Sequence, residues 1–146
     1  MRVKRAKKEA EDNYYEYLFL LFATIVFLDR VLKTFLVDSC WSIFCIKRAM
    51  NPGAAFGILP GMTWFFIGVA AVIILAIALF IGEFKGISKL AFIFIAAGTA
   101  ANMIDRIFFS NVIDLFSVFG SASFNLADLS NLAGAIMLVI GLVRKK

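Results

Sequence analysis

The sequence predicts an all-α membrane protein: a bundle of four transmembrane helices with a small extracytoplasmic β-structure after the first helix. Of the 146 residues, 62% are hydrophobic and only 17% are charged, whereas soluble domains are roughly 45–50% apolar. Four apolar runs also approach or reach the roughly 20 residues that a membrane crossing needs. Because this length leaves room for four crossings with short connections, we expect a single integral-membrane domain over residues 1–146.

The elements follow in chain order from charge and apolar runs. Residues 1–16 are dense in both signs of charge, which predicts a solvated tail. The second span has no charge, and the third has only Lys89 near its start, where a long side chain can reach the interface. Alternation over residues 41–46 favours a short strand in the first outer connection. The predicted spans cover about 17–37, 62–81, 87–104 and 126–143.

The basic residues indicate how the chain is oriented, since cytoplasmic loops collect Lys and Arg. Ten of the 15 fall in the tail, the second-to-third connection and the C-terminus, so we expect both termini to be cytoplasmic. The net charge of +5 is then explained by this rule and by attraction to anionic membrane lipids, with no nucleic-acid partner. The ten are Arg2, Lys4, Arg5, Lys7, Lys8, Lys85, Lys89, Arg144, Lys145 and Lys146.

Residue types that are rare or absent exclude several chemistries. The chain has no histidine, which rules out Ser-His-Asp catalysis and histidine-ligated metal sites. Cys40 and Cys45 are too few for a metal cage; they could form one disulfide, but inert apolar packing is favoured. A Ser-Lys peptidase using Ser42 and Lys47 is disfavoured, because no dry pocket is evident around Lys47.

Five acids lie in or near the outer half of the predicted bundle, and all five are Asp. An ionisable group at membrane depth is costly unless it is paired or functional. Asp29 and Lys33 are four apart on one helix face, which predicts a structural ion pair. Asn102 and Arg106 share a side of the third helix near its end, and structural and ligand-holding roles for Arg106 are equally open. The five are Asp29, Asp38, Asp105, Asp114 and Asp128.

Asp114 and Asp128 are the candidate catalytic pair, because each is flanked by apolar residues. Two carboxyls brought together in a poorly hydrated site cannot both ionise, so one keeps a proton. One member can then activate water while the other protonates the leaving amide, as in aspartic proteases. From the acids alone, proton relay in a small transporter and helix anchoring in a scaffold remain open alternatives.

Four motifs in the same order resemble those of lipoprotein signal peptidase (signal peptidase II), an intramembrane aspartic peptidase family. The resemblance covers residues 17 to 143. Ala101 stands where the family usually has Gly, and Leu115 where it usually has an aromatic residue. The motifs are the Asp29 and Lys33 pair, NPGAAFG at 51–57, ANMIDR at 101–106 with VIDL at 112–115, and FNLAD at 124–128.

The resemblance implies removal of signal peptides from lipid-modified prolipoproteins, just before the lipidated cysteine, at the outer side of the bacterial cytoplasmic membrane. It identifies Asp114 and Asp128 as the catalytic dyad and Asn51 and Arg106 as substrate-holding residues. It also implies a small β-structure near residues 38–61 and no cofactor. We expect a monomer. The residues expected to support the site are Gly53, Asn102, Asp105 and Asn125.

Overall fold

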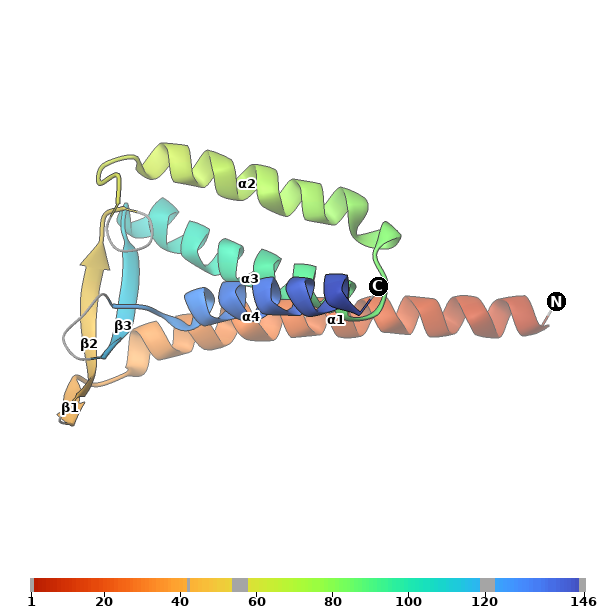
Figure 1. The fold of residues 1–146 in the computed structure, drawn as a ribbon, viewed down its shortest axis with the longest axis horizontal. Coiled ribbons are helices and arrows are strands. Elements are labelled where there is room, and N and C mark those ends of the chain that lie inside the picture. The colour runs from red at the N-terminus through yellow and green to blue at the C-terminus, as the bar shows by residue number, and fades with distance from the viewer. Residues whose placement is uncertain (1, 42, 54–57, 119–122, 145–146) are drawn as a thin grey trace.

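A computed structural model describes residues 2–41, 43–53, 58–118 and 123–144. Helices α1, α2, α3 and α4 run lengthwise, and a small antiparallel sheet lies across one end of them (Figure 1). Both chain termini lie toward the opposite end, and α1 extends beyond the other helices there (Figure 1). The helices are α1 (Arg2–Phe35), α2 (Thr63–Phe80), α3 (Gly86–Phe109) and α4 (Leu126–Val143), with a short 3₁₀ turn η2 (Ile81–Glu83) after α2.

Within the described residues, three helical segments are long and apolar enough to cross a membrane: Thr63–Glu83, Gly86–Phe109 and Leu126–Val143. Helix α1 has the length, but Asp29, Arg30 and Lys33 interrupt its apolar part. The residues predicted as a charged tail belong to α1, which is continuous from Arg2. Length and composition therefore support three of the four predicted spans. The assignment of α1 as a span stays a prediction.

The small residues of α3 place it in the middle of the bundle, against α1, α2 and α4. Its buried positions are mostly Ala, and they include Ala101. At Gly134 of α4, an added Cβ would lie only 2.6 Å from the Ala91 carbonyl oxygen, and Gly98 of α3 has equally little room beside Ala127. Small residues at such contacts let helix backbones approach closely. The close α3–α4 contact brings the end of α3 beside the start of α4.

The sheet has the order β1-β2-β3 and is antiparallel throughout. Its strands are β1 (Ser39–Trp41), β2 (Phe44–Asn51) and β3 (Val112–Val118). The predicted single strand over 41–46 is wrong in extent, because the chain turns between β1 and β2 within it. Strand β3 lies in a segment where no strand was expected, so an all-α description is incomplete.

Cys40 and Cys45 form a disulfide, so the interpretation of inert thiols is wrong. The two residues are directly paired in the register of β1 and β2. This pairing places their side chains opposite each other. The spacing of the two cysteines in the sequence could not predict this, because it does not show where the chain turns. The bridge ties the outer edge strand to the centre of the sheet.

Candidate active site

Asp114 and Asp128 are delivered to one place by β3 and by the first turn of α4. Asp114 lies on β3 opposite Ala49 of β2. Helix α3 ends at Phe109 because Ser110 takes a left-handed conformation (φ 58°) and its N–H donates to the Arg106 carbonyl. The chain then turns back across the helix ends as β3, which sets Asp114 beside the start of α4.

Two asparagine side chains connect the two carboxylates. Asn125 Nδ2 donates to Asp114 Oδ1 at 2.9 Å and lies 3.2 Å from Asn102 Oδ1. Asn102 Nδ2 in turn donates to Asp128 Oδ1 at 2.9 Å. A continuous chain of amides therefore joins Asp114 to Asp128. Because an amide carries donors and an acceptor in fixed directions, this chain holds both carboxylates in one relative orientation.

The start of α4 fixes Asp128 a second time. Asn125 is the N-cap of the helix and accepts from the Asp128 backbone N–H at 2.9 Å, while Asp128 Oδ2 accepts from the Asn125 N–H at 3.1 Å. This reciprocal capping box satisfies backbone N–H groups that a helix start otherwise leaves open. Asn125 is fully buried, so one residue caps α4 and positions both Asp side chains.

Asp114 is buried, and its second oxygen accepts from Asn51 Nδ2 at 3.2 Å. Burial and then the nearby charge of Asp128 raise the pKa of Asp114 to about 6, against hydrogen bonds from Asn51 and Asn125 that favour the ionised form. The site thus has one carboxyl that is more easily protonated than an ordinary Asp.

Arg106 reaches the end of β2. Its Nη2 donates to the Gly53 carbonyl at 3.0 Å, and its guanidinium lies 5.0 Å from the centre of the Phe66 ring. The Gly53 N–H donates to Asn51 Oδ1 at 3.0 Å. Arg106, Gly53 and Asn51 therefore form one connected edge of the site. Residues 54–57 of the NPGAAFG motif, like Ser42 of the Ser-Lys alternative, lie outside the described residues.

A buried cluster of charges lies behind the two carboxylates. Lys33 Nζ is 2.7 Å from Asp29 Oδ2 and 2.7 Å from Asp105 Oδ2, and Arg30 also contacts Asp105. Asp29 and Asp105 are fully buried and Lys33 is 2% exposed. The sequence predicts Asp29 and Lys33 as an ion pair and Asp105 as a support of the site, but not the contact that joins Asp105 to Lys33. It predicts no role for Arg30, whose position beside Asp29 is the signal that could have indicated one.

This cluster also binds the backbone next to each candidate carboxylate. Asp105 Oδ2 accepts from the Ile113 N–H at 3.1 Å, and Asp29 Oδ1 accepts from the Ala127 N–H at 3.0 Å. Asp38, in contrast, is exposed and accepts from the Arg48 N–H at 3.4 Å. In the described part of the chain, no group of three or more His, Cys, Asp or Glu residues is arranged to hold a metal ion.

Comparisons with known proteins agree on one family. The sequence profile described as Signal peptidase (SPase) II matches residues 21–144. The chain is 35% identical over 130 residues to the lipoprotein signal peptidase of Syntrophomonas wolfei, covering 82% of this chain and 87% of the relative. It is 30% identical over 143 residues to that of Clostridium acetobutylicum, covering 86% and 93% of the two chains.

A solved structure has the same fold. It is described as a bacterial membrane enzyme structure determined by the in meso method at 2.3 Å resolution, and it matches with a TM-score of 0.82 at 26% identity over 88% of each chain. The family resemblance predicted from the four motifs is confirmed, and a transporter or scaffold is not favoured. This integral membrane protein therefore belongs to the lipoprotein signal peptidase (signal peptidase II) family.

Proposed function

We propose that the chain is an aspartic endopeptidase that uses Asp114 and Asp128 to remove the signal peptide of lipid-modified prolipoproteins, just before the lipidated cysteine. Membership of the family establishes the prolipoprotein signal peptidase activity. The observation that supports the aspartic mechanism is the amide chain through Asn125 and Asn102, which holds the two carboxylates in one site.

The mechanism assigns opposite protonation states to the pair. Asp114 is the member of the pair that holds a proton more readily than an ordinary Asp, because burial and the charge of Asp128 raise its pKa to about 6, and the reacting form of the enzyme is the one in which Asp114 is protonated. Ionised Asp128 accepts a proton from water as the water oxygen adds to the scissile carbonyl carbon. Asp114 then gives its proton to the departing nitrogen as the carbon–nitrogen bond breaks. The acid and amine products leave Asp128 protonated and Asp114 ionised, and proton exchange with water restores the starting state.

The edge formed by Asn51, Gly53 and Arg106 is the proposed substrate-binding side. Arg106 supplies a positive charge to this edge, and its guanidinium donors that do not bind the Gly53 carbonyl can hold a polar group of the substrate. Asn102, Asn125 and Asp105 support the site from behind by fixing side chains and backbone. The Asp29 and Lys33 pair is structural.

The membrane arrangement that we propose has four spans in one domain, with α1 as the first. The charged residues of α1 within the bilayer are paired in the buried cluster, which removes the main objection to α1 as a span. Both termini would be cytoplasmic, and the sheet and the carboxylate pair would face the outer side of the bacterial cytoplasmic membrane. The termini and the sheet lie at opposite ends of the molecule, which agrees with this orientation (Figure 1). The proposed enzyme acts as a monomer.

Substitution of each carboxylate tests the mechanism. Asp114→Asn and Asp128→Asn should each lower cleavage of a lipidated precursor by several orders of magnitude, because Asn can neither accept nor donate the required proton. The double variant should be hardly worse than either single one. Asp38→Asn is the matched control and should stay active, since Asp38 is exposed and outside the site. A folded single-site variant that cleaves at near the parental rate would refute the proposed pair.

A further inference from the structure

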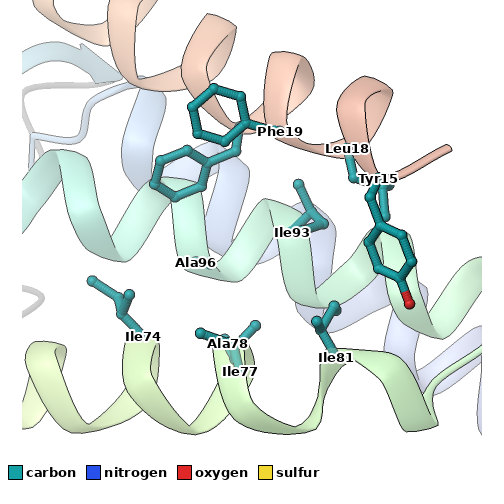
Figure 2. Close-up of a pocket in the computed structure, with 10 residues that line it drawn as sticks. Tyr15, Leu18, Phe19, Ile74, Ile77, Ala78, Ile81, Ile93 and Ala96 are labelled. Atoms are coloured by element: carbon teal, nitrogen blue, oxygen red, sulfur yellow. The ribbon is translucent and has the colours of Figure 1, made fainter. Parts of the chain in front are cut away.

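A groove lined by apolar side chains lies between α1, α2 and α3, at the end of the bundle away from the sheet (Figures 1 and 2). Its volume is about 290 Å³. The walls come from all three helices, and a run of isoleucines on α2 faces large apolar residues of α1 across it (Figure 2). The main wall residues are Leu18, Phe19, Ile74, Ile77 and Ile93. The groove is separate from the carboxylate pair and takes no part in the proposed cleavage.

A buried cation, Lys89, lies beside the groove, next to the wall residue Tyr15. Tyr15 lines the groove, and its hydroxyl lies 3.2 Å from Lys89 Nζ. The ammonium group of Lys89 is stacked on aromatic rings, 4.6 Å from the centre of Tyr15 and 5.5 Å from that of Tyr14. Lys89 is only 8% exposed, because the two tyrosines cover its ammonium group.

Among the side chains that the structure describes, which begin at Asn13, no acid neutralises this cation. Lys89 forms no ion pair with any of them, and tyrosine contacts only partly replace the water that its ammonium group has lost. A buried charge is costly unless it is paired. Lys89 thus lacks a neutralising negative charge among these side chains, and we call this lack the charge deficit. Lys33 has no such deficit, because it is also buried but contacts two carboxylates. A ligand that brings a negative charge to Lys89 would remove the deficit.

The start of α3 adds to the positive potential at this place. Lys89 lies one turn into α3, whose first turn has no acid and whose N-cap Lys85 makes no side-chain cap. The first backbone N–H groups of a helix carry partial positive charge and bind anions. A helical side chain also leans toward the N-terminus of its helix, so the charge of Lys89 adds to the positive potential of the helix start.

We propose that this groove binds one anionic phospholipid, with an acyl chain between α1 and α2 and the phosphate group at Lys89. The apolar walls match the chain, and the buried ammonium group beside an uncapped helix start matches the phosphate. Tyr14 and Tyr15 lie where the two parts of the lipid meet, as aromatic residues do at membrane interfaces. A net negative head group distinguishes this lipid from a zwitterionic one, whose own cation would oppose Lys89.

Competition between two lipids tests the head-group part. The purified full-length protein in detergent is mixed with equal amounts of phosphatidylglycerol and phosphatidylcholine with identical acyl chains, and bound lipid is counted by native mass spectrometry. Phosphatidylglycerol should be retained about five-fold over phosphatidylcholine. Lys89→Gln should abolish the preference, and Lys85→Gln, at an exposed position, should keep it. Equal retention of the two lipids by the parent, or an unchanged preference in Lys89→Gln, would overturn the proposal.

Filling the groove tests the acyl-chain part without touching the charge. Ala78 lines the groove, so Ala78→Phe should lower retention of phosphatidylglycerol several-fold. Ala76→Phe changes an exposed residue of α2 that does not line the groove and should leave retention unchanged. Glycerol phosphate, which has the charge but no chain, should fail to compete even at a hundred-fold excess. Competition by glycerol phosphate, or full retention in Ala78→Phe, would show that the groove does not bind the chain.

Discussion

The Asp114→Asn variant should be more stable than the parent protein at neutral pH, although it should be inactive. In the folded protein, burial and the charge of Asp128 oppose ionisation of Asp114 and raise its pKa to about 6. The unfolded chain has no such opposition. The parent therefore loses folding free energy whenever Asp114 is ionised, and asparagine removes the charge while keeping nearly the same shape.

The pKa shift sets the size of the gain. A rise from 3.8 to about 6 corresponds to about 3 kcal/mol of folding free energy, at about 1.36 kcal/mol for each unit. Asparagine loses part of this, because one of its two polar atoms is a donor. In the parent, the two carboxylate oxygens of Asp114 accept from Asn51 and Asn125. The amide nitrogen of the new asparagine cannot accept, so one of these hydrogen bonds is lost, at a cost of about 1 kcal/mol. The net gain should be about 2 kcal/mol, which raises the unfolding midpoint by about 4 to 8 °C.

The sign of the effect also fixes its pH dependence. Because the pKa of Asp114 is higher in the folded than in the unfolded state, the parent becomes less stable as pH rises from 3.8 through about 6. The advantage of Asp114→Asn should therefore be present above pH 6 and disappear near pH 4. Thermal unfolding in detergent at a series of pH values measures it, with exposed Asp38→Asn as the control. A variant less stable than the parent at pH 7.5, or a difference independent of pH, would refute the reasoning.

Two further predictions concern orientation and the charge cluster. Reporters fused after Lys146 or between residues 85 and 89 should read cytoplasmic and one near Pro60 external, and an external C-terminus would overturn the proposed orientation. Lys33→Met leaves the buried carboxylates of Asp29 and Asp105 with Arg30 as the remaining cation of the cluster. Thermal unfolding should therefore show that the free energy of unfolding falls by about 3 to 5 kcal/mol. Exposed Lys47→Met should change stability by less than about 0.5 kcal/mol. Parental stability in Lys33→Met would show that the cluster does not stabilise the fold.

The helices were largely predictable because apolar runs have a length scale set by the bilayer. Helix α4 covers the predicted 126–143, and α2 differs by one residue at each end. Helix α3 continues to Phe109 rather than ending at 104, because Asp105 and Arg106 are compatible with the helix once their charges have partners. Charge marks the end of a span only where no partner is available, and sequence alone does not show the partner.

The sheet was harder to predict because its strands pair across long separations. The run Val112–Val118 is rich in strand-forming residues, but its partner β2 lies before two helices in the chain. For the same reason, residue spacing could not predict the amide chain from Asp114 to Asp128. Asn102 and Asn125 were expected to support the site only through the family motifs, and their contacts come from three different elements.

Buried charges and the candidate site occur together in this chain for a structural reason. Asp105 and Asp29 accept the backbone N–H groups of Ile113 and Ala127, the residues that come directly before Asp114 and Asp128. Lys33 holds Asp29 and Asp105 together, so one ammonium group fixes the separation of the two backbone anchors. Apolar side chains could fill the same volume, but they could not accept these two hydrogen bonds. The ion pairs and the two backbone hydrogen bonds therefore offset part of the free-energy cost of burying these charges. The same contacts set the positions of both carboxylates.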